Sequence, residues 1–276
     1  DSKAPSYICT EELHIKDAAQ ERLRKKLCQA IDDDQFEIFL QFVHGVKENG
    51  YVGAEVLSRW NNPEEGLLLP GHYISAMRST GVIEKFDMYM LGKTCALLAD
   101  WSDDDLGQLL VSCNVTRVTI SSADFLKEFN GVLEKYDFDR NRLMIEITED
   151  ALIADKEMAL MNIEGCKKKN IRVAIDDFGA GSTSANEIEI YPVGHLKIDR
   201  HTVTAAIEKR NDKLLKSIID VAHSRGIKVT CEGVETKKQS EAVAQCGTDY
   251  IQGYYYSYVF AKDEGKEHFL KSIKAK

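Results

Sequence analysis

The sequence predicts an α/β barrel of eight strands, and three observations lead to this fold class. Helical and strand-like segments alternate over roughly 200 residues after an initial pair of strand-like runs. That initial pair is separated by a short turn ending in Asn49-Gly50, too short for a parallel crossover. Six later runs bring the total to eight. We therefore expect a TIM-like (β/α)8 barrel with an antiparallel first strand.

The elements follow from the spacing of apolar residues along the chain. Strand-like runs cover residues 36–43, 51–60, 109–114, 143–147, 171–176, 195–199, 227–232 and 250–252. Helical periodicity covers residues 70–79, 85–101, 123–136, 156–169, 212–224 and 236–245. Residues 1–31 are charged and helical in period, and we expect them to be a lead-in helix or connector from an upstream domain. The barrel domain is then expected over residues 32–276.

Composition excludes several classes of protein. The net charge of −9 leaves no basic footprint for a DNA or RNA polymer. Seven cysteines without a CxxC pair argue against a disulfide framework or a zinc site, and favour buried thiols in a reducing compartment. No apolar stretch reaches the roughly 20 residues that span a bilayer. We expect a cytoplasmic segment without membrane contact, whose parent protein could still be membrane-anchored.

Polar residues recur near the carboxyl ends of the predicted strands. They are Asn114, Glu146, Asp176, Asp177, Lys197, Asp199, Glu232 and Gln252, and Glu55 lies inside the apolar second strand. The carboxyl ends of barrel strands form one rim, so these residues should converge. Their carboxylates would repel one another unless cations lay between them, and hard oxygen ligands favour Mg²⁺ or Mn²⁺. Two adjacent aspartates can bridge two ions roughly 3.5–4 Å apart, which suits attack on a phosphodiester.

Each of these residues has a simpler interpretation when taken alone. A single Glu or Lys at a strand end is usually a solvated edge residue. Asp177-Phe178-Gly179 could be only a turn, because Asp and Gly favour turns. The recurrence of such residues at successive strand ends favours a site over a series of unrelated surface groups.

The motifs, in their order along the chain, resemble the EAL-domain family of cyclic di-GMP phosphodiesterases. The resemblance runs from about Phe36 to Phe260, with an EVL variant of the signature. The matching strings are Glu55-Val56-Leu57-Ser58-Arg59, Cys113-Asn114-Val115-Thr116, Glu146-Ile147-Thr148-Glu149, Asp176-Asp177-Phe178-Gly179-Ala180-Gly181, Leu196-Lys197-Ile198-Asp199, Glu232-Gly233-Val234-Glu235-Thr236 and Gln252-Gly253-Tyr254. Each string is weak alone, and the ordered set is specific.

This resemblance implies a role for each matched residue. One metal ion would bind Glu55, Asn114, Glu146 and Asp176, and a second would bind Asp176, Asp177 and Glu232. Lys197 would position or deprotonate the attacking water, with Gln252 in support. The substrate would contact Gln41, Leu57, Arg59, Asp199 and Glu235. Glu149 would anchor the loop that follows Asp177. The family also implies a homodimer, and the lead-in helix resembles the connector that follows a GGDEF domain.

The chain departs from the family pattern at several positions. In the loop after Asp177, Ala180 replaces a usual Thr, while Ser182 and Thr183 replace a usual aromatic residue and Ser. Because these small residues bring little apolar surface to hold the loop, we expect modest basal activity. Other departures are Val56 for Ala, Phe42 for Pro and Arg78 for Glu.

Three functions are compatible with this pattern. The first is hydrolysis of one phosphodiester bond of cyclic di-GMP to linear pGpG by a metal-activated water. The alternative is a catalytically weak or silent receptor for cyclic di-GMP, and the third is a protein-interaction module that binds no nucleotide. Silent relatives typically lose metal ligands or the lysine. Here all of those positions are filled, which favours the enzyme.

Overall fold

The strands close into a barrel in the computed structural model, which describes residues 4–102, 105–148, 156–179, 192–208 and 212–274. The order around the barrel is β1-β9-β8-β7-β6-β5-β4-β2, and β2 pairs back with β1. The eight strands are β1 (Phe36–Gly45), β2 (Gly50–Asn62), β4 (Leu110–Asn114), β5 (Leu143–Thr148), β6 (Arg172–Phe178), β7 (His195–Ile198), β8 (Lys228–Cys231) and β9 (Tyr250–Ile251). β1 is antiparallel to both of its barrel neighbours, and the other pairs of neighbouring barrel strands are parallel. The predicted fold class is confirmed.

The β1–β2 hairpin closes the barrel. Its turn brings Asn49 to a φ of 49°, a left-handed conformation that Asn tolerates better than most residues. One edge of β1 pairs along its length with β2. The other edge pairs first with β10 (Val259–Ala261) and then with β9. A further short strand, β3 (Gly66–Leu68), covers the end of β2. The sequence patterns missed β3 and β10 because three residues are too few to show a period.

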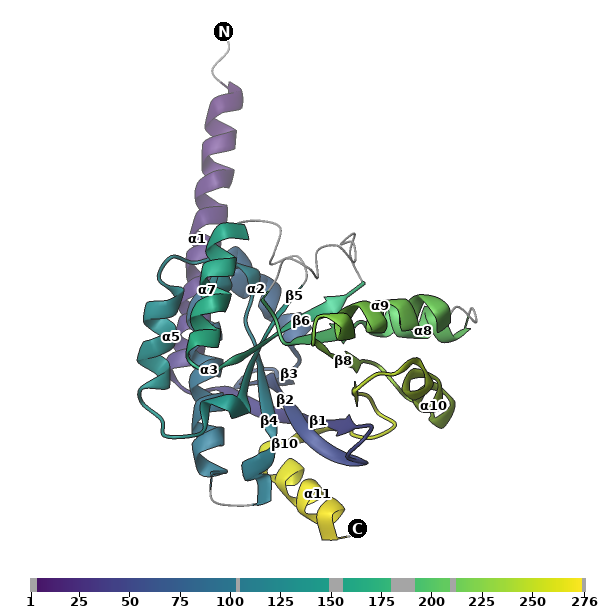
Figure 1. The fold of residues 1–276 in the computed structure, drawn as a ribbon. Coiled ribbons are helices and arrows are strands. Elements are labelled where there is room, and N and C mark those ends of the chain that lie inside the picture. The colour runs from purple at the N-terminus through teal and green to yellow at the C-terminus, as the bar shows by residue number, and fades with distance from the viewer. Residues whose placement is uncertain (1–3, 103–104, 149–155, 180–191, 209–211, 275–276) are drawn as a thin grey trace.

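Helices surround the barrel on its outer side (Figure 1). They are α1 (Ala4–Asp32), α2 (Ile74–Ser79), α3 (Ile83–Asp100), α4 (Arg117–Ile120), α5 (Phe125–Leu133), α7 (Lys156–Lys168), α8 (Arg200–Glu208), α9 (Asp212–Ser224), α10 (Lys237–Cys246) and α11 (Lys262–Lys274), with 3₁₀ turns η1 (Pro70–His72), η2 (Asp105–Gln108) and η3 (Arg140–Arg142). α1 extends well away from the barrel, and its described buried residues lie in its last turns. Helix α10 starts with a capping box between Thr236 and Gln239 and ends at Gly247 in the left-handed conformation.

Three of these helices, α4, α8 and α11, were not predicted, and α4 is too short to show a helical period. α8 and α11 are rich in charged and polar residues, and α11 buries only Gly265 and Phe269. Such helices form because the barrel offers a surface to pack on, and their own periodicity gives a weak signal. None of the described helices combines the length and the apolarity that crossing a membrane requires.

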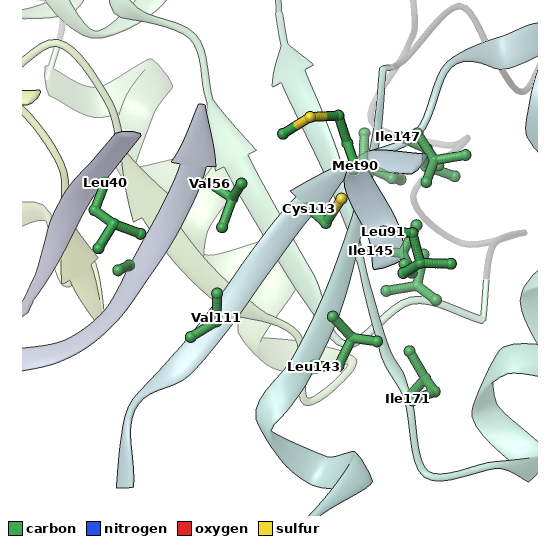
Figure 2. Packing of buried hydrophobic residues seen from close by; sticks show 14 of the residues in the cluster. Leu40, Val56, Met90, Leu91, Val111, Cys113, Leu143, Ile145, Ile147 and Ile171 are labelled. Carbon is green, nitrogen blue, oxygen red and sulfur yellow. The ribbon is translucent and has the colours of Figure 1, made fainter. Parts of the chain in front are cut away.

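The outer faces of the barrel strands carry the apolar core. On β4 and β5, the buried side chains of Val111, Cys113 and Ile145 belong to one apolar cluster with Met90 and Leu91 of α3 (Figure 2). Because side chains alternate along a strand, the intervening residues point into the barrel: Ser112, Asn114, Met144 and Glu146. The apolar core thus lies between the strands and the helices, and polar groups occupy the barrel interior.

A pair of glycines tests the packing at the β2–β4 junction. A Cβ on Gly53 would lie 2.5 Å from the carbonyl oxygen of Leu110 on β4, whereas a Cβ on Gly131 in α5 meets no atom within 4 Å. Gly53→Ala should therefore lower the free energy of unfolding by about 1–3 kcal/mol, because strands must move apart. Gly131→Ala should raise it by about 0.5–1 kcal/mol, because a helix interior favours Ala. Urea denaturation of both variants measures the difference, and shifts of the same sign would contradict this packing.

Candidate active site at the carboxyl end of the barrel

A buried lysine lies at the centre of the polar residues inside the barrel. The Nζ atom of Lys197 on β7 is 2.8 Å from Glu146 Oε2 and from Glu232 Oε1. It is 3.2 Å from Glu55 Oε2 and from Asp176 Oδ1. Five residues from five segments of the chain therefore meet at one ammonium group.

Two amide side chains complete the hydrogen bonding of Glu55. Asn114 Nδ2 donates to Glu55 Oε1 at 2.8 Å, and Gln252 Nε2 donates to Glu55 Oε2 at 2.7 Å. Gln252 Nε2 also lies 3.1 Å from Gln41 Oε1. Burial alone would raise the pKa of Glu55. Lys197 and the two amides outweigh this effect and hold that pKa below its ordinary value.

The other carboxyl groups are not compensated to the same degree. Burial, followed by the proximity of Glu55 and Asp176, raises the pKa of Glu146 well above its ordinary value despite Lys197. Burial likewise raises the pKa of Glu232 to about 8, with Asp176 and Glu55 adding to the effect. The pKa of Lys197 is raised although burial opposes it, because its carboxylate neighbours favour the charged form. We call this group of residues the cup: Lys197, Glu55, Glu146, Asp176, Asp177 and Glu232. The carboxylates of the cup carry more negative charge than its one lysine can balance.

The arrangement of the carboxylates suits divalent cations. One ligand atom from each of Asp176, Asp177 and Glu232 lies within 4.8 Å of the others. Asp176 Oδ1 is buried and, among the described residues, accepts no hydrogen bond, although Lys197 Nζ lies 3.2 Å away. Consecutive residues of a regular strand point to opposite faces. Asp176 and Asp177 nevertheless line one cavity, because the β6–β7 pairing is irregular there and Asp177 has a φ of 55°. Oxygen donors of this kind fit Mg²⁺ or Mn²⁺.

A cavity of about 360 Å³ opens above this cluster. Its walls include Asp199 and Glu235, two of the expected substrate contacts. Asp199 Oδ1 accepts hydrogen bonds from the backbone N–H groups of His201 at 2.8 Å and Thr202 at 3.3 Å, and so caps the start of α8. Glu235 forms an ion pair with Arg200 at 2.8 Å.

The remaining expected residues lie elsewhere. Leu57 and Arg59 lie two and four residues after Glu55 on β2, so their side chains are on the same face of the strand as Glu55. Neither residue lines the cavity of about 360 Å³. The guanidinium carbon of Arg59 lies 5.2 Å from the centroid of the Phe39 ring. The expected loop anchor Glu149 lies outside the described residues, as do Ala180, Ser182 and Thr183.

Comparison with known proteins places this geometry in a family. The sequence model of the family described as the EAL domain matches residues 24–258, which is most of the chain. The chain belongs to the EAL domain family. The resemblance inferred from the motifs is confirmed.

Two relatives show the level of similarity. The cyclic di-GMP phosphodiesterase RocR of Pseudomonas aeruginosa is 28% identical over 244 residues, which cover 88% of this chain and 61% of RocR. The cyclic di-GMP phosphodiesterase PdeL of Escherichia coli is 28% identical over 229 residues, covering 83% of this chain and 63% of PdeL. This EAL domain thus spans less than two thirds of the length of either relative.

Solved structures share the fold. The PaMucR phosphodiesterase in complex with c-di-GMP has a TM-score of 0.81 at 24% identity, covering 88% of this chain and 99% of that one. The EAL enzyme Bd1971, bound to cAMP and cyclic-di-GMP, has a TM-score of 0.84 at 23% identity, covering 96% and 74%. At this level of identity the likeness establishes the barrel fold.

The structure adds residues to which the motifs assigned no role. Arg200 and Tyr254 line the cavity of the EAL domain beside the predicted residues. Tyr254 is 51% exposed, and its ring is stacked with that of Tyr258 at 5.4 Å between centroids. Clustered tyrosines after Gln252 are a signal that could have been followed, because exposed stacked rings are uncommon away from binding surfaces.

Asp87 is a third residue missed from the sequence. This carboxylate on α3 is buried, and its Oδ2 accepts hydrogen bonds from Thr116 N at 2.8 Å and from the hydroxyls of Thr116 and Thr119 at 2.6 Å. All three donors lie just after Asn114. Asp87 therefore fixes the turn that follows this expected metal ligand. No sequence signal links residues 87 and 116, because only the fold brings them together.

Asp87 should make the stability of the domain depend on pH. Burial raises its pKa from 3.8 to about 6, although the threonine donors oppose the shift. The folded state therefore disfavours the charged form, so Asp87 lowers stability as pH rises from about 4 through 6, by about 3 kcal/mol in total. Asp87→Asn should remove this component, and urea denaturation of parent and variant at pH 5 and pH 8 measures the part of it, about half, that falls between these two pH values. An identical pH dependence in the two proteins would exclude this behaviour of Asp87.

Proposed function

We propose that this EAL domain hydrolyses one phosphodiester bond of cyclic di-GMP to linear pGpG with the help of divalent metal ions. One observation carries the proposal: Lys197 and the Asp176, Asp177 and Glu232 carboxylates occupy one cup below an open cavity. The names of RocR and PdeL support the choice of substrate. The PaMucR and Bd1971 structures, which contain bound cyclic di-GMP, support it too.

The ions proposed are two Mg²⁺ or Mn²⁺. When bound, they lower the pKa of a water molecule and offset charge on the phosphate. The first group of ligands is Glu55, Asn114, Glu146 and Asp176, and the second is Asp176, Asp177 and Glu232. The unbalanced negative charge of the cup supports this assignment, as does the buried Asp176 Oδ1, which accepts no hydrogen bond from the described residues.

The residues of the chain then have separate tasks. We assign to Lys197 the orientation of the attacking water and the stabilisation of charge on the phosphate, because its ammonium is held in place by four carboxylates. Gln252 holds Glu55 in position through its 2.7 Å hydrogen bond. Asp199 and Glu235 line the cavity that would receive the nucleotide.

The surroundings of the domain are part of the proposal. The relative MucR of Pseudomonas aeruginosa is named a bifunctional diguanylate cyclase and phosphodiesterase, and this chain matches 36% of its length. That relation supports an upstream GGDEF or sensor domain. A homodimer and a cytoplasmic location stay predictions.

Formation of pGpG with Mg²⁺ or Mn²⁺ is the decisive measurement. Hydrolysis identifies the enzyme. Tight binding of cyclic di-GMP in Ca²⁺ without any pGpG would instead identify the silent receptor. The absence of both would leave only an interaction module.

Removing Asp176 should abolish most of the activity. Asp176→Ala deletes a carboxylate shared by both proposed metal sites, so we expect hydrolysis to fall by at least about 10²-fold. Asp220→Ala is the matched control, because that aspartate is exposed on α9 and contacts only Lys216 among the recorded ion pairs of the described residues. Near-normal turnover by a folded Asp176→Ala domain would refute the metal assignment.

Lys197 should affect turnover more than substrate binding. Lys197→Met keeps much of the apolar stem and removes the charge, so kcat should drop sharply while affinity for cyclic di-GMP in Ca²⁺ changes by less than about tenfold. Steady-state kinetics and calorimetric titration give the two quantities separately. Loss of binding with unchanged turnover of whatever substrate is bound would show that Lys197 has a different role.

A further inference from the structure

A second cavity lies in the lower part of the barrel, below Lys197. It has a volume of about 390 Å³, and Glu146, Lys197 and Gln252 line it together with residues closer to the amino ends of the strands. Exposed residues at its other end include Gln108, Asp139, Asn141 and Arg172, so it extends toward the face opposite the cup. Barrel interiors are normally filled by bulky side chains. Here Gly53, Ser112 and Thr230 are too small to fill the space.

Three polar side chains that line this cavity make no hydrogen bond within the described protein. Ser112 is 3% exposed, and His195 and Thr230 are each 5% exposed. Within the described residues these three side chains make no hydrogen bond and line the cavity, whereas Gln252 Oε1 is buried without a partner. Buried polar groups are nearly always hydrogen-bonded. The buried Gln252 Oε1 and the three cavity-lining side chains indicate that molecules inside the cavity, water or a ligand, supply the missing hydrogen bonds.

The wall of the cavity also indicates the charge and shape of those contents. Burial, aided by the nearby charge of Arg172, lowers the pKa of His195 to about 4. Its ring is therefore neutral and offers one donor and one acceptor. The ring lies nearly parallel to that of Tyr250, with centroids 6.1 Å apart. At the inner end, the charge of Lys197 is already engaged by Glu146 at 2.8 Å. An anion there would face the carboxylates of the cup.

We propose that this lower cavity is a binding site for a planar, uncharged heterocycle about the size of a nucleobase. Its volume falls in the range of small-molecule sites, roughly 300–1,000 Å³. A heterocycle offers ring nitrogens and exocyclic groups to Ser112, His195 and Thr230, whereas a hydrocarbon would leave these groups unpaired. The bound molecule would touch Lys197 and Glu146 from the side opposite the cup. It would thus reduce hydrolysis without competing with cyclic di-GMP, a consequence that rests on the proposed function.

The binding test uses Met144, which lines the lower cavity and is 8% exposed. The protein is labelled with ¹³C at the methionine methyl groups, and the Met144 signal is assigned with Met144→Leu. Adenine is the probe, with indole as a flat comparison that has a single ring N–H and no ring acceptor. We expect adenine to shift the Met144 signal with a Kd of roughly 1 mM or below, the range for a ligand of this size, and indole to bind at least about tenfold more weakly. An unmoved Met144 signal, or equal affinity for both probes, would overturn the proposal.

Matched variants locate the binding. Ser112→Ala combined with Thr230→Val removes two hydroxyls with little change in volume, and should weaken adenine by about tenfold or more. Tyr254→Ala alters the upper cavity only and should leave adenine binding unchanged. If the double variant does not fold, Ser112→Ala alone should weaken adenine by several-fold. Weakening by Tyr254→Ala but not by the hydroxyl deletions would place adenine in the upper cavity and refute the site.

A kinetic measurement then tests the link to the cup. Adenine should lower kcat for pGpG formation without raising KM for cyclic di-GMP, and the double variant should resist this inhibition. Competitive inhibition would contradict the link. Because the Met144 signal is read without turnover, an inactive domain would refute the proposed function and leave the binding test intact.

Discussion

The ammonium group of Lys197 holds the interior of the barrel together. Glu55, Glu146, Asp176 and Glu232 come from strands far apart in sequence, and all four lie within 3.2 Å of its Nζ atom. Without a cation between them, these buried carboxylates would repel one another or take up protons. The lysine therefore permits a polar barrel interior. Its single charge is nevertheless too small to balance four carboxylates, and this imbalance creates the demand for divalent ions.

The polarity of the interior also explains where the apolar core lies. In β4 and β5, Val111 and Ile145 belong to the apolar cluster (Figure 2), and the alternation of side chains along each strand turns Ser112 and Glu146 inward. Stability comes from apolar packing between the sheet and the helices, so the residues along the barrel axis can be polar. Two cavities lie along that axis, one on each side of Lys197. A packed apolar barrel core would leave room for neither.

The sequence predicted those parts of the molecule that depend on local pattern. The eight barrel strands alternate or cluster apolar residues strongly, and strand ends are marked by polar residues, so Glu146, Asp176 and Lys197 could be found without a structure. β3 and β10 are too short to show a period, and α8 and α11 form on a surface supplied by the rest of the fold. Asp87 was missed because its partners Thr116 and Thr119 are brought near by tertiary packing alone. Asp177 lines the same cavity as Asp176 because Asp177 itself has a left-handed backbone conformation in an irregular part of β6. No pattern of residue types predicts this conformation.

The pairing of β1 has a consequence for synthesis of the chain on the ribosome. Phe39–Gln41 pair with residues 259–261, and His44 and Gly45 pair with Ile251 and Tyr250. This edge of the hairpin must stay unpaired until more than 200 further residues have been translated. Unpaired strand edges readily join other chains, and contacts so distant in sequence form slowly. A nascent or truncated barrel would thus expose the unpaired edge of β1, which favours aggregation until the carboxyl-terminal strands have been made.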